Sequence, residues 1–318
     1  MKQDFIPRKP GRFCPLDYYF DEDEFTKKPM FSCETLYIAG GMYGNPFAFE
    51  ALETLAAKEP GARVVLNGDM HWFDRSPADF VENERRAEKW LCLLGNVEAE
   101  LRRGEESCAG CGCAYPPCVD DAAVARSNAI HAELKKTLTQ IPAVAEKLKK
   151  RAGAAVVDVC GARVGITHGD ERSLGGWNCS LENLRIPARR AELTAWMEKS
   201  GLAVLATTHT CAAAAFARLE RAVINNGAAG MPNFRGALYG LITRISPRPE
   251  AHAIYRARVR GLYVEAVPLR WDADKFLNWF NGNWPAGSPA EISYRERITQ
   301  GAGAEPQDAL IEGFEPLG

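Results

Sequence analysis

Short apolar runs alternate with helical spacing over the first hundred residues. The runs at residues 36–39, 64–66 and 91–94 each end in glycine or polar residues and predict buried strands. Between them, residues 47–58 and 77–90 space their apolar side chains as helices do. A repeated order of strand, loop and helix is typical of a parallel sheet.

The pattern changes after residue 103. Residues 104–152 open with a segment rich in Cys, Gly and Pro and continue as polar helices, which we interpret as an insertion or cap. Strands return at 155–159 and 163–167 as a predicted hairpin, and several strands without helices between them follow from residue 222 to 267. The second half is therefore expected to be mostly antiparallel.

These patterns suggest one large domain with two extensions. The predicted division is an irregular N-terminal extension at 1–32, a main domain at 33–270 and a C-terminal helix with a surface tail at 271–318.

Composition narrows the class of protein. Of 318 residues, 46% are hydrophobic and 25% are charged, which are ordinary globular values. The 39 basic and 41 acidic residues nearly balance, so neither a nucleic-acid surface nor an anionic membrane is expected as a partner. No apolar run approaches the ~18 residues of a membrane span, and the N-terminus lacks the apolar region of a signal peptide. A cytoplasmic location is the simplest expectation.

Polar residues gather where the predicted strands end, which is where α/β sheets bind ligands. Asp69, Asn96, His168 and His209 follow four different strands, and together they offer the mixed oxygen and nitrogen donors of a metal site. The alternative is that Asp69 and Asn96 only cap helices and that backbone groups satisfy both histidines.

The order of these segments resembles that of the calcineurin-like metallophosphoesterases, over roughly residues 35–270. The matching segments are Gly44-Asn45, Gly68-Asp69, Gly95-Asn96, His168-Gly169-Asp170, His209-Thr210 and residues 224–230. The resemblance implies an α/β fold, a four-layer sandwich of two mixed β-sheets flanked by helices. It also implies hydrolysis of a phosphoester by metal-activated water.

Four departures from the family pattern change the expected site. Gly41 and Tyr43 replace the first Asp and His, Val97 replaces a catalytic His, and Cys211 replaces the last His. The family's second set of metal ligands is complete, so the resemblance implies one divalent ion (Mn, Fe or Zn) per active site. Its expected ligands are Asp69, Asn96, His168 and His209. The first set of ligands retains only Asp69, with Cys211 as a substitute ligand.

The catalytic acid is missing at Val97. His71 and Glu98 are the nearest replacements, although solvated loop positions are slightly favoured for both. Tyr43 is expected either to donate its hydroxyl to a bound phosphate or to plug the vacated metal site. Asn45 is expected to contact the phosphate.

Four cysteines crowd together at Cys108, Cys111, Cys113 and Cys118. Their close spacing suggests a possible second metal site holding structural zinc, and the alternative is a Cys-rich turn without metal. The spacing matches neither common ferredoxin pattern.

The resulting expectation is a metal-dependent phosphoesterase that acts on a small phosphorylated substrate through an atypical, mononuclear site. Two alternatives stay open. One is a catalytically inactive protein of the same fold that binds a phosphorylated ligand or partner. The other is a metal-responsive or redox module built on the cysteine cluster.

Overall fold

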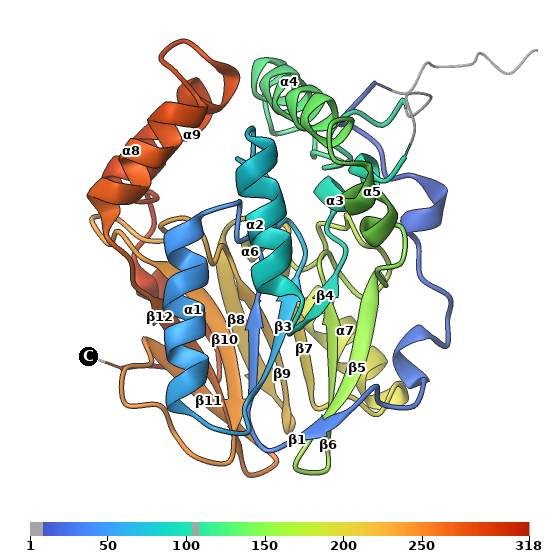
Figure 1. Cartoon of the computed structure of the whole chain (residues 1–318). Coiled ribbons are helices and arrows are strands. Elements are labelled where there is room, and N and C mark those ends of the chain that lie inside the picture. Colours follow the sequence, from blue (N-terminus) through green and yellow to red (C-terminus); the bar gives the residue numbers. More distant parts are fainter. Residues whose placement is uncertain (1–8, 104–107, 318) are drawn as a thin grey trace, which may run out of the picture.

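The computed structural model describes residues 9–103 and 108–317. Within these ranges the chain forms two seven-stranded mixed sheets that pack face to face (Figure 1). The first, called the β2 sheet, runs in the order β14 (Glu315–Pro316), β11 (Tyr255–Val259), β12 (Leu262–Leu269), β10 (Gly240–Ser246), β2 (Leu36–Ala39), β3 (Arg63–Asn67) and β4 (Leu91–Leu93). The second, called the β6 sheet, runs in the order β1 (Ser32–Cys33), β5 (Ala154–Val159), β6 (Ala162–Thr167), β7 (Val204–Thr207), β9 (Arg221–Asn226), β8 (Ala213–Arg218) and β13 (Leu310–Glu312).

Helices flank both sheets. The α-helices are α1 (Pro46–Lys58), α2 (Pro77–Ala87), α3 (Asn96–Leu101), α4 (Asp121–Leu138), α5 (Pro142–Leu148), α6 (Leu181–Leu184), α7 (Pro187–Lys199), α8 (Ala273–Asn283) and α9 (Pro289–Gln300). Short 3₁₀ turns are η1 (Leu16–Tyr18), η2 (Glu24–Thr26) and η3 (Pro306–Ala309). None of the described helices is both long and apolar enough to cross a membrane.

The largest buried cluster lies between the two sheets. Ile38 and Val65 of the β2 sheet share one buried cluster with Val157 and Ile224 of the β6 sheet. On the outer faces, Phe49 of α1 covers the β2 sheet, while α6 and α7 cover the β6 sheet. The predicted four-layer sandwich is confirmed.

Most predicted elements are present with shifted ends. The three early strands are β2, β3 and β4, and they pair in parallel. The predicted hairpin is the antiparallel pair β5 and β6. Strand β8 was not predicted, because Ala213–Ala217 contains only one large apolar side chain, Phe216.

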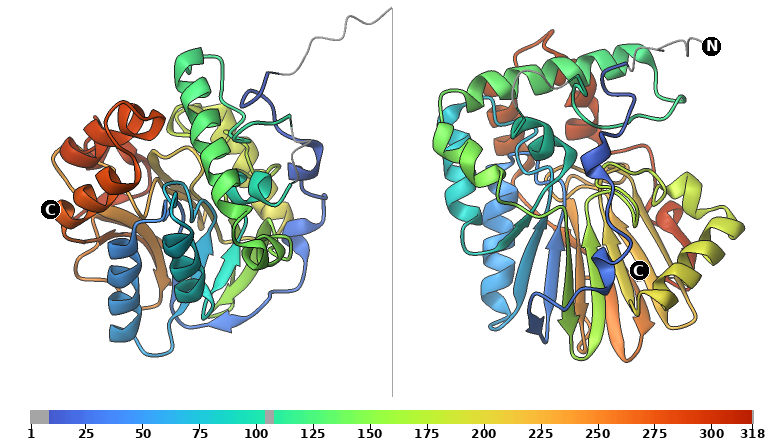
Figure 2. Two further views of the ribbon diagram at one scale, coloured as in Figure 1. Left: turned by 45° about the horizontal axis from the view of Figure 1, so that its top comes forward. Right: turned by 90° about the vertical axis from the view of Figure 1, so that its right-hand side faces the viewer.

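Residues 9–32 and 271–317 contain more regular structure than the sequence suggests. Within the predicted irregular extension, Tyr18 is buried and donates its hydroxyl to Glu100 Oε1 at 2.8 Å. The predicted surface tail contains a second helix, α9, which begins at a serine cap followed by proline. Figure 2 shows that α4, α8 and α9 gather over one end of the sheets. Their apolar residues join one buried cluster, so the C-terminal helices belong to the same core as the insertion.

Truncating this shared core should destabilise the whole protein. Phe280 of α8 is fully buried, and its ring lies 5.0 Å from that of Phe73 in an edge-to-face contact. Phe280→Ala should lower the free energy of unfolding by about 3–5 kcal/mol in urea titrations. Ile292→Ala on α9, where the side chain is 58% exposed, should change it by less than about 0.5 kcal/mol. Equal effects would mean that α8 packs only loosely.

Candidate metal centre

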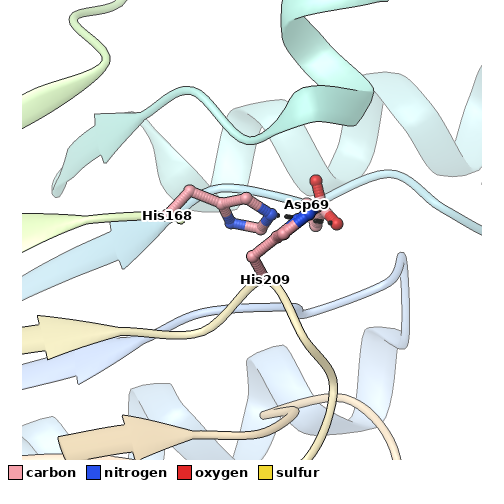
Figure 3. A group of neighbouring side chains, drawn as sticks. All are labelled: Asp69, His168 and His209. Atoms are coloured by element: carbon pink, nitrogen blue, oxygen red, sulfur yellow. Dashed lines mark ion pairs between the residues drawn. The ribbon is translucent and has the colours of Figure 1, made fainter. Parts of the chain in front are cut away.

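Four loops that leave neighbouring strands meet at one end of the sandwich. Asp69 follows β3, Asn96 begins α3 after β4, His168 follows β6 and His209 follows β7. The strands pair in parallel as β3 with β4 and β6 with β7, which brings each pair of loops to the same edge. Donor atoms of Asp69, His168 and His209 all lie within 4.8 Å of one another (Figure 3), and all three residues are buried.

Backbone carbonyls orient both histidines toward this point. His168 Nδ1 lies 2.9 Å from the carbonyl oxygen of Asn67, while its Nε2 lies 3.1 Å from Asn96 Oδ1 and 3.3 Å from Asp69 Oδ2. His209 Nε2 lies 3.0 Å from the carbonyl oxygen of Cys113, and its buried Nδ1 has no partner. A carbonyl bonded to one ring nitrogen leaves the lone pair of the other for a metal. The residues therefore fit a divalent ion.

The electrostatics of the group agree with that fit. Burial opposes ionisation of Asp69, but the neighbouring His168 outweighs it and lowers the pKa of the carboxyl group. Burial also disfavours the His168 cation, yet Asp69 outweighs it and raises the pKa of that imidazole. Burial and repulsion from His168 lower the pKa of His209 to about 3. The pair therefore favours a positive charge at His168, where a metal cation would take the place of a proton.

Glu98 does not lie in the position of a catalytic acid. Its buried carboxylate accepts hydrogen bonds from three backbone N–H groups, those of Asp69 and Met70 at 2.8 Å and of Gly95 at 3.0 Å. Asp69 has a left-handed backbone with φ of 52°, which this carboxylate holds in place. Glu98 supports the metal ligand rather than facing the pocket, and neither sequence-based reading of it anticipated this.

His71 also points away from the site. It is fully buried, with Nδ1 2.6 Å from Asp74 Oδ2 and Nε2 2.8 Å from Glu84 Oε1, and its ring stacks on Phe80. Burial disfavours the cation, but the two carboxylates outweigh it and raise the pKa of His71 to about 9. It is neither a solvated loop residue nor a free acid.

Tyr43 is buried and lines the cavity beside Asp69 and Cys211. Gly41 has φ of 68°, and a Cβ placed on it would lie 3.0 Å from the Tyr43 ring. The Tyr43 hydroxyl lies 2.7 Å from Cys211 Sγ. Cys211 is not among the side chains close enough to share the ion. Burial raises the pKa of its thiol, which disfavours the thiolate form that a metal ligand needs.

Asn45 does not reach the pocket either. Its Oδ1 accepts from the N–H groups of Phe47 and Ala48, and its Nδ2 donates to the carbonyl oxygen of Gly230 at 3.1 Å. The residue is fully buried as the N-cap of α1. Its side-chain amide is engaged in the cap and with Gly230 rather than facing the cavity, and the cap explains why asparagine stands there.

The cysteine cluster contacts the candidate ligands through its backbone. Cys111 and Cys113 are buried whereas Cys108 and Cys118 are exposed, and no group of three or more of them converges within residues 9–103 and 108–317. The carbonyl oxygen of Cys111 accepts from Asn96 Nδ2 at 2.8 Å, and that of Cys113 holds His209. The structure does not bring the four thiols of the expected zinc site together, and the backbone of this loop faces inward.

A cavity of about 160 Å³ adjoins the candidate ligands. Its lining combines three of the four ligands with aromatic and sulfur-containing side chains: Tyr43, Asp69, Trp72, Asn96, Val97, Cys113, Tyr115, Trp177, His209, Thr210, Cys211 and Tyr294. The insertion and α9 thus wall the site, which the sequence pattern did not suggest.

The cysteine loop should control metal affinity through its backbone. Gly112 has φ of 67°, and a Cβ there would clash with the Tyr18 hydroxyl and lie 2.7 Å from Glu100 Cγ. Gly112→Ala should shift the flanking carbonyls and weaken metal binding about 10–100-fold in calorimetric titrations. Gly161→Ala is the matched control, since φ there is 87° and nothing lies within 4 Å of the added atom. Unchanged affinity in Gly112→Ala would contradict the supporting role.

The buried His71 cation should make stability depend on pH. Its pKa rises from 6.5 in the unfolded chain to about 9, so its contribution is complete below the lower value and is lost as pH rises through the upper one. His71→Gln should therefore cost roughly 2–4 kcal/mol of unfolding free energy at low pH and much less at high pH. Urea unfolding of both proteins across that range measures the difference. A pH-independent difference would mean that His71 is neutral.

Two solved structures share this fold at low sequence identity. A metallophosphoesterase from Sphaerobacter thermophilus superposes with a TM-score of 0.55 at 15% identity, over 84% of this chain and 100% of that one. A hypothetical protein, PH1004, from Pyrococcus horikoshii OT3 gives a TM-score of 0.58 at 13% identity, over 86% and 100%. No protein-family model matches the chain, and no curated protein matches it in sequence. The chain therefore has the fold of the metallophosphoesterases.

Proposed function

We propose that this protein hydrolyses a phosphoester with one divalent metal ion held by Asp69, Asn96, His168 and His209. The observation that carries the proposal is the orientation of the two imidazoles. Backbone carbonyls occupy one nitrogen of each ring, and the other nitrogen points to the carboxylate of Asp69 or into the centre. Such preorganised donors at strand ends are the usual architecture of a metal site.

The donor set restricts the ion. One carboxylate, one amide oxygen and two imidazole nitrogens form a mixed set that suits Mn, Fe or Zn better than a calcium or a thiophilic ion. When bound, such an ion lowers the pKa of a coordinated water and polarises a phosphoryl oxygen.

The chain's own residues position the ligands and exclude water. Glu98 fixes the backbone at Asp69, and the Cys111 and Cys113 carbonyls fix Asn96 and His209. Val97 occupies the position of the missing acid and has no proton to transfer. Apart from the proposed ligands, no histidine or carboxylic acid lines the cavity in the described part of the chain.

This lack of a catalytic acid in the cavity lining, among the described residues, favours a second candidate function. With His71 and Glu98 both held away from the cavity, the site can bind a phosphorylated ligand without cleaving it. The loss of an acid typically costs about 10²–10⁴-fold in rate, so turnover decides between the two functions.

Metal content tests the proposal directly. Wild-type protein should hold one equivalent of Mn or Zn after dialysis, and His209→Ala should hold far less because a ligand is lost. Cys118→Ala, which removes an exposed thiol, should keep the full equivalent. Elemental analysis measures the content, and release of nitrophenolate from bis(4-nitrophenyl) phosphate measures turnover.

Two results would contradict the proposal. Two equivalents lost together in His209→Ala would point to a binuclear site. One equivalent of metal without any turnover would mean that the protein binds a phosphorylated ligand and does not hydrolyse it.

A further inference from the structure

Aromatic rings from separate parts of the chain surround the candidate metal centre. Three half-buried rings come from three segments: Tyr115 from the insertion, Trp177 from the loop after β6 and Tyr294 from α9. Tyr43 and Trp72 add two buried rings to the same cavity. None of the three half-buried rings lies on a strand of the two sheets, so the additions to the fold build this wall.

The rings are held in place by polar anchors. Trp177 donates Nε1–H to the carbonyl oxygen of Cys113 at 2.8 Å, and its ring meets that of His209 edge to face at 5.4 Å. The Tyr115 hydroxyl lies 3.0 Å from Ser127 Oγ on α4. Tyr294 packs edge to face on Phe73 at 5.2 Å. Fixed rings offer a preformed surface for a flat apolar group.

The cavity lacks the cations that usually bind a phosphate dianion. No lysine or arginine lines it within the described residues. Arg297 lies behind Cys211 and donates to the carbonyl oxygens of Pro232 at 2.7 Å and Cys211 at 2.9 Å. A divalent ion with the single carboxylate of Asp69 carries a net charge of +1, which one negative charge on the ligand neutralises.

We propose that the ligand of this site is a monoanionic phosphodiester with an aryl group, and that the aromatic wall selects the ring. This inference rests on the proposed function for its metal. The cavity has room for the ring, because a cavity of about 150 Å³ holds benzene and this one measures about 160 Å³, and the phosphate would lie at the metal ligands. A dianionic monoester would leave one charge unbalanced among apolar rings.

The lack of a catalytic acid at Val97 also favours an aryl ester as the ligand. In the hydrolysis, the water oxygen forms a bond to phosphorus, and the bond between phosphorus and the aryl oxygen breaks. The phenolate leaves with the electron pair, and the two protons of water pass to the phosphate product and to solvent. An aryl oxygen leaves as a stable anion, whereas an alkyl oxygen needs the proton that Val97 cannot give.

Three stable phosphonates separate the effect of the ring from that of charge. Methyl phenylphosphonate carries a ring and one charge, methyl methylphosphonate lacks the ring, and phenylphosphonate at alkaline pH carries the ring with a second charge. Calorimetry on zinc-loaded protein should show methyl phenylphosphonate binding about 10–100-fold more tightly than methyl methylphosphonate. It should also bind more tightly than the phenylphosphonate dianion.

Two variants test whether the aromatic wall causes the preference for a ring on the ligand. Tyr294→Ala and Tyr115→Ala, on different segments, should each reduce the ring preference at least about threefold. Tyr19→Ala, a tyrosine that is 56% exposed and outside the cavity, should leave it unchanged. If one wall variant fails to fold, the other still gives the result.

The outcomes separate this inference from the proposed hydrolysis. Equal binding of the phenyl and methyl ligands, or tighter binding of the dianion, would overturn the inference even if esters are cleaved. The expected ring preference without turnover of methyl 4-nitrophenyl phosphate would support the ligand class and overturn the hydrolase instead.

Discussion

The arrangement of the site depends on one buried carboxylate. Glu98 accepts three backbone N–H groups, two from the loop after β3 and one from the loop after β4. Hydrogen bonds to an ionised acceptor are stronger than neutral ones, so this carboxylate ties two strand ends into one unit. Asp69 returns the link, since its Oδ1 accepts from the N–H of Val97 at 3.2 Å. These hydrogen bonds fix both loops, so the Asp69 carboxylate is held in place beside His168 and His209, which follow strands of the β6 sheet.

The proposed ligands could be predicted from the sequence because each directly follows a strongly apolar strand. Asp69, Asn96, His168 and His209 are placed by strand order, which apolar runs reveal. The supporting residues could not be assigned in this way. The partners of His71 are Asp74 and Glu84, and the sequence gives no sign that all three side chains turn inward together.

Elements with weak patterns account for most of the remaining differences. Strand β8 is built largely of alanine, and α9 buries only Ala290 and Ile298, so neither has a clear apolar period. The cysteine spacing suggested thiolate ligands, yet Gly110 and Gly112 adopt left-handed turns that direct carbonyl oxygens to the site. The sequence suggested a chemical role for the thiols of this loop. The path of the loop instead places its backbone carbonyls in hydrogen bonds with Asn96 and His209.

The contact between Gly41 and the Tyr43 ring has a consequence for how such a site can evolve. An aspartate at position 41 meets the ring, because its Cβ would already lie 3.0 Å from Tyr43. Removing the ring first leaves a void beside Phe73, whose ring lies 5.9 Å away, before any new ligand is gained. Neither single substitution improves the packing, so a ligand at position 41 requires that Gly41 and Tyr43 change together.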